Sequence, residues 1–343
     1  MEWITPEHER AEINAAARVL LKNGSLPEEE QQWASDIVNN WRYAHNYPLN
    51  TFKVTLREYA KKAFVAAIVA ERRKRLESIL WKLDREPKMK LTQMQDIAGC
   101  RAILGGVASV DRLVEIYRKS NLKHKLHHIK DYIRKPKPSG YRGVHMIYEY
   151  YSDKRKTWNG LKVELQFRSK LQHVWATAVE TVGAFTRQAL KSSRGQAEWL
   201  RFFALMASHI ARTEKTILVP NTPTEERQLK IELSACAQEL NAIAQLEAFQ
   251  QSIGATKESD ILRSSGYYLL VLNTAESPAS LAITGYRKSQ LEEAVTDSTE
   301  AEKNPDLNVV LVSVSSLKAL RRAYPNYFAD TESFLRIVKD AIA

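Results

Sequence analysis

Two acidic residues lie beside predicted strands, where carboxylates could hold a metal ion. Asp96 comes just before a glycine and an apolar stretch in Gln95-Asp-Ile-Ala-Gly. Glu164 lies in Leu161–Arg168, where apolar and polar residues alternate strictly, so this strand buries one face and lays a polar row along the other. Two carboxylates that converge on one Mg²⁺, one of which also approaches a hydroxyl group, can support metal-assisted phosphoryl transfer. Asp96 considered by itself is equally typical of a turn.

A hydroxyl group and several cations form a second candidate site between residues 71 and 85. A helix that begins near Arg75 places three of these groups within one narrow arc and puts apolar residues on the opposite face. Arg72 and Lys74 point the same way if the preceding apolar stretch is a strand. A polyphosphate could lie along this stripe, although a charge run is more often a solvated face. The three helical residues are Ser78, Lys82 and Arg85.

A loop rich in prolines, glycines and cations follows at residues 132–145. Its prolines and glycines exclude a helix. The cations surround one aromatic residue, Tyr141, and an exposed ring among cations suits a phosphate-bearing base, because the ring stacks on the base while the cations meet the phosphates. A basic surface loop is the alternative interpretation. The cations are Arg134, Lys135, Lys137 and Arg142.

The residues named so far require a scaffold, and the sequence predicts an α/β one. The pattern is helical from Pro6 to about Ala63, with a break at residues 23–27, and short apolar runs then alternate with amphipathic segments and Gly/Pro loops. A second helical region starts at Ser169, on which His173 beside Trp175 is more typical of a packed residue than of a catalyst. The sequence predicts four parts: an N-terminal helical part at residues 1–62, an α/β core at residues 63–213, a helical connector at residues 214–253, and a small α+β domain at residues 254–343. The last part is long enough to be a separate domain with a core of its own.

Composition limits the class of protein. The net charge of +11 over 343 residues favours a polyanionic partner, although many basic proteins bind no nucleic acid. The longest strongly apolar stretch, Ala63–Ala70, is far shorter than the roughly 20 residues of a membrane span, so we expect a cytoplasmic protein with no membrane contact. Cys100 and Cys236 are too few for a disulfide framework or a cysteine-based zinc site.

Four motifs, taken together and in order, resemble the RelA/SpoT alarmone synthetase domain over about residues 40 to 200. The resemblance implies a mixed β-sheet flanked by helices and the transfer of pyrophosphate from ATP to the 3′-hydroxyl of a guanine nucleotide. The motifs are Arg72-x-Lys74-x3-Ser78-x3-Lys82, Asp96-Ile-Ala-Gly-x-Arg101, Pro136-Lys-Pro-Ser-Gly-Tyr141-x3-His145 and Glu164-x-Gln-x-Arg168-x4-His173-x-Trp-Ala.

The same resemblance implies a role for each residue. ATP would be bound by Arg72 and Arg101 at the adenine and by Lys74, Ser78 and Lys82 at the phosphates. Asp96 and Glu164 would be the catalytic acids and would bind Mg²⁺, with Glu164 also activating the attacking hydroxyl. Tyr141 would stack on the acceptor base, supported by Arg142, His145 and Arg168. Gln166 and His173 would support these residues from behind.

The C-terminal segment at residues 315–331 is similar to that of fused toxin–antitoxin members of the CapRel type. Those proteins resemble a toxin joined to its inhibitor: they modify the 3′-terminal adenosine of tRNA, which stops translation, and a phage capsid protein releases them. Their inhibitory domain is a degenerate zinc finger, and no cysteine/histidine cluster follows Gly254, so we expect no zinc. We hypothesise that Tyr324 and Tyr327 occupy the adenine site between Arg72 and Arg101. Both could instead be ordinary turn and core residues.

Two other functions remain open at this point. A small alarmone synthetase making (p)ppGpp or (p)ppApp would use the same core with a mononucleotide acceptor, whereas a non-catalytic RNA-binding regulator would need none of the acids and cations that are present. Basic residues after the Glu164 strand favour tRNA, although a solvated helix face would explain them almost as well. These residues are Arg187, Lys191, Arg194 and Arg201. A fused inhibitor allows a monomer, which we expect in place of the tetramer common among alarmone-producing members.

Overall fold

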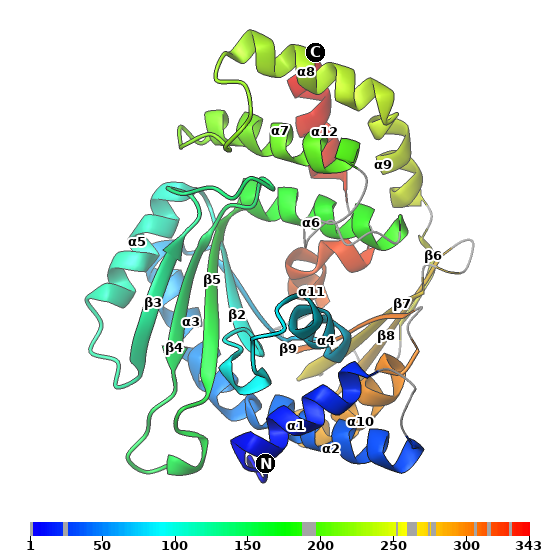
Figure 1. The fold of residues 1–343 in the computed structure, drawn as a ribbon. Coiled ribbons are helices and arrows are strands. Elements are labelled where there is room, and N and C mark those ends of the chain that lie inside the picture. Colours follow the sequence, from blue (N-terminus) through cyan, green and yellow to red (C-terminus); the bar gives the residue numbers. More distant parts are fainter. Residues whose placement is uncertain are drawn as a thin grey trace.

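The computed structural model joins its strands into a single sheet (Figure 1). Within the described residues the strand order is β3-β4-β5-β2-β1-β9-β7-β8-β6, with parallel pairing between β2 and β5 and between β6 and β8. The expected mixed sheet flanked by helices is therefore confirmed. The structure describes residues 3–22, 27–186, 197–251, 253–258, 266–273, 275, 279–304, 307–313, 317–328 and 331–343.

The strands of the core fall where the sequence alternates or runs apolar. Val163, Leu165 and Phe167 are fully buried in β5, as their alternation predicts. Strand β6 has no counterpart in the sequence prediction. The strands are β1 (Ile68–Arg73), β2 (Ala98–Leu104), β3 (Lys125–Asp131), β4 (Val144–Glu149), β5 (Lys162–Ser169), β6 (Ile253–Glu258), β7 (Tyr267–Asn273), β8 (Ala279–Tyr286) and β9 (Leu307–Ser313).

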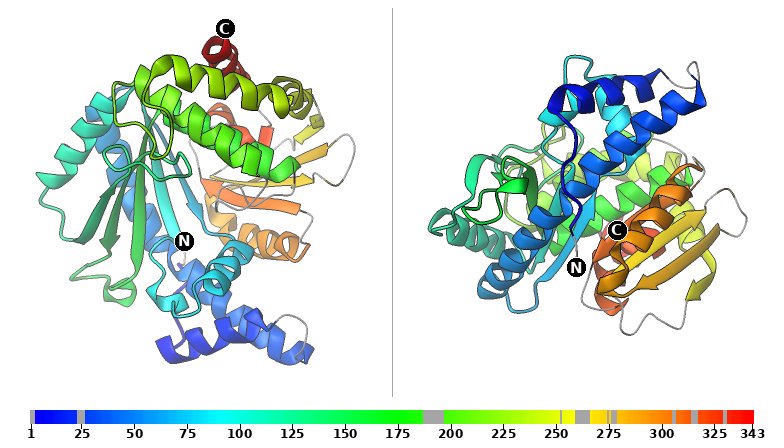
Figure 2. Two further views of the ribbon diagram at one scale, coloured as in Figure 1. Left: turned by 45° about the horizontal axis from the view of Figure 1, so that its top comes forward. Right: turned by 90° about the horizontal axis from the view of Figure 1, so that it is seen from below.

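Helices cover both faces of this sheet. α3, α5 and α10 lie on one face, and α6 and α11 lie on the other. α7, α8, α9 and α12 form a further layer on α6 (Figures 1 and 2). In the described ranges, no helix has both the length and the apolar character that a membrane crossing needs. The helices are α1 (Arg10–Leu21), α2 (Glu28–Ala44), α3 (Asn46–Ala63), α4 (Leu76–Arg85), α5 (Val107–Arg118), α6 (Lys170–Phe185), α7 (Ala197–Thr213), α8 (Glu226–Glu239), α9 (Ala242–Gln251), α10 (Leu291–Glu302), α11 (Leu317–Ala323) and α12 (Glu332–Ile342).

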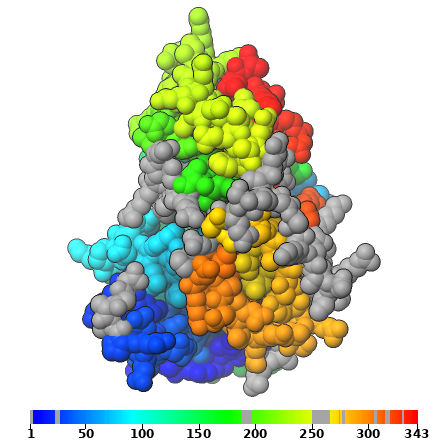
Figure 3. All heavy atoms as spheres, turned by 90° about the vertical axis from the view of Figure 1, so that its right-hand side faces the viewer, coloured from blue at the N-terminus to red at the C-terminus, as the bar shows by residue number. Residues whose placement is uncertain are grey.

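The C-terminal strands extend the core sheet. β9 pairs antiparallel with β1 through Glu71 with Ser313 and Arg72 with Val312. The sequence-based prediction of a small C-terminal α+β domain did not include this pairing, which joins its strands to the core sheet. The physical reason is that β1 would otherwise leave an unpaired edge, which β9 covers. Figure 3 shows the C-terminal strands and α10, in yellow and orange, packed between the blue N-terminal helices and the green and yellow helices of the upper layer.

Polar contacts reinforce the junction between β1 and β9. Lys53 of α3 donates to the carboxylate of Glu71 at 2.9 Å and to the hydroxyl of Ser313 at 3.0 Å. Arg42 of α2 pairs with Glu302 of α10 at 2.9 Å. All of these side chains except that of Glu302 are less than 9% exposed. Buried ion pairs need complete geometry to be tolerated, so they fix one relative placement of the two regions.

The chain then crosses from the sheet to the upper helical layer. α12 buries Phe334 against Phe203 of α7, with ring centroids 5.8 Å apart. The segment between β9 and α12 contains α11 and the short 3₁₀ helix η6 (Pro325–Phe328). β9 is paired with β1 and α12 is packed on α7, so the elements before and after α11 and η6 are both fixed, and α11 lies over β1.

Candidate active site

The strand register places the predicted site residues on one face of the sheet. Arg72 of β1 pairs with Gly99 of β2, which in turn pairs with Glu164 of β5. Arg101 pairs with Gln166 one step along. Paired residues of neighbouring strands point to the same side, so the arginines and the carboxylate share the face covered by α6 and α11. Two further predicted site residues on this face are His145 and Arg168.

Glu164 is held by hydrogen bonds on both oxygens. His145 Nδ1 donates to Oε1 at 2.8 Å, and Gln166 Nε2 donates to Oε2 at 2.6 Å. His145 Nε2 lies 2.5 Å from the hydroxyl of Tyr141, to which Arg168 Nη2 donates at 3.2 Å. Burial alone would raise the pKa of Glu164, but the charge and hydrogen bond of His145 lower it to about 2. The carboxylate is therefore ionised and fixed in direction, and the supporting role predicted for Gln166 has a direct structural basis.

Asp96 stands just before β2 between two lysines. Lys74 donates to its Oδ2 at 3.0 Å and Lys82 donates to its Oδ1 at 2.8 Å. Burial would raise the pKa of Asp96, but the two lysine charges hold it well below its ordinary value. Asp96 precedes β2 by two residues, and β2 pairs with β5, the strand that carries Glu164. Ser78 is on the same helix as Lys82, one turn earlier. The glycine after Asp96 lies inside strand β2, which corrects the prediction of a glycine turn.

The two arginines predicted to hold adenine are available for a ligand. Neither Arg72 nor Arg101 donates a hydrogen bond to another side chain in the described part of the chain, and Arg101 Nε is buried without an acceptor. Burial and the nearby charge of Arg168 lower the pKa of Arg101 to about 10. A flat or anionic ligand would stabilise such a guanidinium group, because burial has removed its hydration and no described residue accepts its hydrogen bond.

Tyr324 and Tyr327 lie beside these arginines. Tyr324 is 4% exposed, and its hydroxyl donates to the backbone carbonyl of Glu71 at 2.6 Å. Tyr324 also packs in one cluster with Ala70, the strand partner of Arg101, so it lies over β1 near both arginines. In the described residues no ring–guanidinium stacking joins the tyrosines to these arginines, so the stacked contact that we hypothesised is corrected to close proximity. Both tyrosines also belong to a hydrophobic cluster with β7 and β9.

His173 connects the core to this C-terminal segment. Its Nε2 lies 3.3 Å from the backbone carbonyl of Arg322 in α11, and its Nδ1 has no partner in the described ranges. Burial and the charges of Arg101 and Arg168 lower the pKa of His173 to about 3, so the ring is neutral and Nε2–H donates. His173 therefore lies behind the arginines and contacts the segment that carries the two tyrosines.

Tyr141 differs from the exposed ring that the sequence suggested. It is half-buried, and its ring face carries the Arg168 guanidinium 5.1 Å from the centroid. Lys137 Nζ lies 5.5 Å from the same centroid. A base that stacks on this ring must therefore share it with cations. Arg134 is instead paired with Asp131 and Asp111.

Arg142 is a structural residue, which corrects its assignment to the acceptor. It is 3% exposed and pairs with Glu214 at the end of α7 at 2.7 Å. Glu214 also accepts from Ser169 and from Gln172 Nε2, the latter at 3.0 Å. The sequence gives no signal for Glu214, because the two partners lie 72 positions apart. This network fixes the loop at residues 132–145 against α6 and α7.

Arg142→Ala is expected to destabilise the protein strongly. It leaves the Glu214 carboxylate buried without its cation, a change that costs about 3–5 kcal/mol of unfolding free energy. Arg134→Ala is the matched control: it removes an ion pair whose arginine is 61% exposed, and its effect should stay below about 1 kcal/mol. Urea unfolding followed by circular dichroism measures both. Equal, small losses would show that the Arg142 network does not hold the loop.

The basic residues predicted to follow an RNA backbone receive little support. Arg187, Lys191 and Arg194 lie outside the described residues. Arg201 Nε pairs with Glu232 at 2.6 Å, and its Nη1 donates to the carbonyl of Asn221. Arg201 therefore links α7 to α8 and is already occupied.

Comparison with known proteins agrees with the geometry of this face. Residues 71–185 match a family model described as a region found in RelA / SpoT proteins. We call these matched residues, about a third of the chain, the RelA/SpoT-like region. It contains Arg72, Asp96, Tyr141 and Glu164, and it ends with α6. The C-terminal strands and α7 lie outside it.

Individual relatives match this chain only in part. GTP pyrophosphokinase YwaC of Bacillus subtilis (strain 168) is 32% identical over 109 residues, which cover 30% of this chain and 51% of that protein. The chain thus spans about half the length of this curated relative. Small alarmone synthetase 1 of Bacillus subtilis bound to pppGpp is 21% identical, with a TM-score of 0.45 over 54% of this chain and 94% of that one. A GTP pyrophosphokinase family protein from Streptococcus pneumoniae is 27% identical, with a TM-score of 0.40 over 49% and 83%.

Proposed function

We propose that the protein is a Mg²⁺-dependent pyrophosphokinase that transfers pyrophosphate from ATP to the 3′-terminal adenosine of tRNA and so inhibits translation. In this proposal its C-terminal region inhibits it, and a phage protein such as the capsid protein releases it as part of phage defence. The observation that carries the catalytic part is the single face on which Asp96, Glu164 and the cations converge. The acceptor, the trigger and a monomeric state are parts of the proposal that the CapRel-type resemblance supports.

The donor ATP would be held by cations that now neutralise Asp96. Lys74 and Lys82 can exchange the carboxylate for donor phosphates, because each forms a single short contact to it and both remain partly exposed. Arg72 and Arg101 would contact the adenine with their unpartnered guanidinium groups. Phosphoryl transfer of this kind depends on positioning and charge neutralisation, which these four residues supply without a covalent nucleophile.

The two acids fit a magnesium ion that binds together with its nucleotide. Mg²⁺ commonly takes one or two carboxylates plus substrate phosphates and water. Asp96 and Glu164 come from adjacent strands, and each keeps its carboxylate ionised. A magnesium ion held by these two acids would supply positive charge that offsets the charge of the donor phosphates. Lys74 and Lys82 would then exchange their contacts with Asp96 for contacts with the donor phosphates, whose negative charge favours this exchange.

Glu164 would orient the attacking hydroxyl. An effective general base has a pKa near the working pH, whereas the pKa of Glu164 is lowered to about 2. Glu164 therefore suits a role as the acceptor of the hydroxyl hydrogen bond, aligned by His145 and Gln166. Such alignment would lower the activation free energy, because the two reactants are already held together and lose less entropy on reaching the transition state.

Inhibition would follow from the position of the α11–η6 segment. Tyr324 and Tyr327 are buried in one cluster with Ala70 of β1, and Tyr324 bonds to the backbone beside Arg72, where the adenine would bind. The anchoring of β9 on β1 and of α12 on α7 supports a closed state that is stable without a ligand. Release requires a partner that binds the open state better, because a ligand shifts an equilibrium only by its difference in affinity.

A second candidate function is the synthesis of alarmones from free guanine or adenine nucleotides. The relative that is 32% identical over part of its length is itself named a GTP pyrophosphokinase. This reading uses the same donor site and needs no RNA contact.

The acceptor can be decided by following the label from ATP. We expect label from γ-labelled ATP to appear on bulk tRNA and not on GTP or GDP when the full chain is incubated with Mg²⁺ and an activating change in its C-terminal region. Added salt should slow the reaction, because RNA binding releases counterions. Label on guanine nucleotide would make the protein an alarmone synthetase. No transfer to any acceptor from a folded preparation would reject both functions.

A further inference from the structure

The net positive charge of the chain is concentrated in residues 118–162. This stretch holds 13 lysines and arginines against three acids, so it carries +10 of the total of +11, and the rest of the chain is almost neutral. It spans β3, β4, the loops beside them and the start of β5. Some of these cations belong to the loop at residues 132–145, whereas a second group lies at the opposite end of the same strands.

This second group, which we call the basic edge, joins the start of β3 to the loop between β4 and β5. Lys123 Nζ lies 2.5 Å from the carboxylate of Asp153 in that loop. The backbone N–H of Tyr151 donates to His124 Nδ1 at 3.2 Å, and the Tyr151 side chain is 47% exposed. An exposed ring among cations suits an unpaired base. The basic edge consists of Lys123, Lys125, Lys154, Arg155, Lys156 and Lys162.

Most of the charge on the basic edge is not neutralised by the protein. Among the residues that the structure describes, Asp153 is the one carboxylate that forms an ion pair with this group, and its partner is Lys123. All members except Lys162 are exposed, and Lys162 is half-buried. A cluster of unpaired, exposed cations attracts a polyanion, because its phosphates replace small counterions that the binding releases.

The basic edge is continuous with the face that carries Glu164. The strand register pairs Lys125 with Glu149 and Glu149 with Lys162, so both lysines point to one side of the sheet. Lys162 lies two residues before Glu164 on β5, which puts it on the same side, with the two Cα atoms about 7 Å apart. Glu149 itself is occupied by His127.

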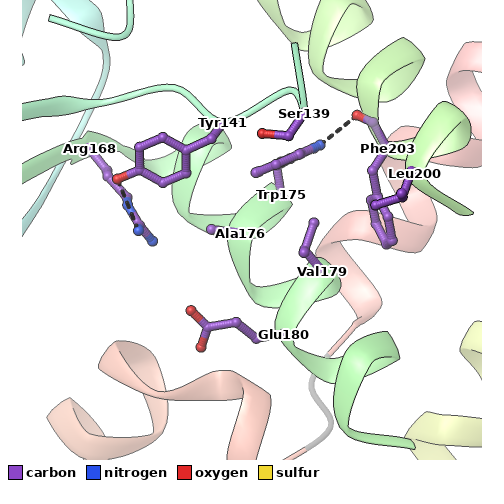
Figure 4. Close-up of a pocket in the computed structure, with 9 residues that line it drawn as sticks. All are labelled: Ser139, Tyr141, Arg168, Trp175, Ala176, Val179, Glu180, Leu200 and Phe203. Atoms are coloured by element: carbon purple, nitrogen blue, oxygen red, sulfur yellow. Dashed lines mark hydrogen bonds between the residues drawn. The ribbon is translucent and has the colours of Figure 1, made fainter. Parts of the chain in front are cut away.

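The other end of β5 is closed by protein contacts. Arg168 Nη2 donates to the Tyr141 hydroxyl there, beside α6 (Figure 4). An acceptor that reaches Glu164 from the side away from α6 therefore passes over the basic edge.

The C-terminal region leaves the basic edge uncovered. β3 forms one edge of the sheet, and the C-terminal strands begin beyond β1, on the other side of β5 and β2 (Figure 1). α11 packs on β1. The segment proposed to block the donor site thus lies away from the basic edge, so we expect the closed chain to keep this surface available.

We propose that the basic edge binds the phosphate backbone of an RNA and places its 3′ end at Glu164. The role of that RNA as the acceptor rests on the proposed function. A free mononucleotide has too few phosphates to span the six cations. RNA is favoured over an anionic membrane because the surface leads onto the face of the two acids, where an acceptor hydroxyl would have to react.

The test measures binding of fluorescein-labelled bulk tRNA to the full, unactivated chain by fluorescence anisotropy at several salt concentrations. The surface variant combines Lys125→Ala, Lys154→Ala and Lys156→Ala, three exposed side chains whose loss should not disturb the fold. Each lost phosphate contact lowers the slope of log affinity against log salt by about 0.7–0.9, so the slope should fall by about two. Affinity at low salt should fall at least about fivefold.

The matched control combines Lys61→Ala, Lys230→Ala and Lys288→Ala. These lysines are also exposed, and they lie on α3, on α8 and just before α10, so the control loses the same charge outside the basic edge. Its affinity and salt slope should equal those of the unchanged chain. An equal change in both triple variants would show that net charge alone sets the binding, and the basic edge would be wrong.

Transfer of label to tRNA by the activated chain separates this proposal from the proposed function. If tRNA received label while the surface variant kept wild-type affinity and slope, the basic edge would be overturned and the proposed function would stand. If tRNA bound through the basic edge but received no label, the proposed acceptor would be wrong and the surface would stand. Binding of phosphatidylserine vesicles but not of tRNA would assign the surface to a membrane and overturn the proposal.

Discussion

Replacing Tyr324 and Tyr327 together by alanine is expected to open the donor site and switch on pyrophosphate transfer. The two rings are buried in one cluster with Ala70 of β1, and the Tyr324 hydroxyl donates to the backbone carbonyl of Glu71, next to Arg72, at 2.6 Å. Their removal vacates the space that adenine needs. Calorimetry with a non-hydrolysable ATP analogue should show affinity at least about tenfold higher than that of the unchanged chain, within the 5–150-fold usual for coupled sites.

Two control variants separate occupancy from a general loosening of the C-terminal region. Tyr324→Phe keeps the ring and loses only the hydrogen bond, so it should remain mostly inhibited. Tyr286→Ala removes a buried ring from β8. The Tyr286 hydroxyl donates to Asp297 at 2.7 Å and contacts neither Arg72 nor Arg101. It should lower stability without raising the affinity for the analogue. If Tyr286→Ala raised the affinity as much as the double variant, loosening of the region would explain inhibition and occupancy would be wrong.

Local patterns in the sequence were enough to locate the face that carries the chemistry. The alternation in β5 puts Glu164, Gln166 and Arg168 on one side of the strand. In any strand with one buried face, apolar and polar residues alternate in this way, whatever packs against the strand. Likewise the helix expected near Arg75 begins at Leu76. These predictions depend on residues close in the chain, for which side-chain direction follows directly from backbone geometry.

Contacts between distant segments could not be predicted in the same way. Nothing in the residues of β1 indicates that its free edge is covered by β9, about 240 positions later. Arg142 looked like an acceptor ligand because it stands among cations in a loop, yet Glu214 turns it into a buried ion pair. The helical pattern that runs to about Ala63 does not show the division between α2 and α3 at His45, whose Nδ1 bonds to the carbonyl of Trp41 at 2.7 Å. Each of these features depends on a partner that a local pattern does not specify.

Glu164→Gln is expected to abolish pyrophosphate transfer while leaving the fold intact. The amide keeps the size of the side chain but loses the charge that would hold Mg²⁺ and accept the hydroxyl hydrogen bond. Misplaced reacting groups can lower a rate about a hundredfold, and a charge that would help to hold Mg²⁺ is lost as well, so the rate with ATP and the preferred acceptor should fall by at least about a hundredfold. Label transfer measured in the activated Tyr324→Ala, Tyr327→Ala background checks this, and analogue binding without Mg²⁺ should change little.

Glu149→Gln provides the matched control for this change. Glu149 lies on the neighbouring strand β4 and pairs with His127 at 2.8 Å, the same distance that joins Glu164 to His145. The two substitutions therefore remove the same charge from the same kind of Glu–His pair, once inside the site and once outside it. Transfer should survive Glu149→Gln. A Glu164→Gln protein that retained more than about a tenth of the rate would show that Glu164 is not the acid that aligns the acceptor, since a loss that small lies below the roughly hundredfold loss expected when reacting groups are misplaced.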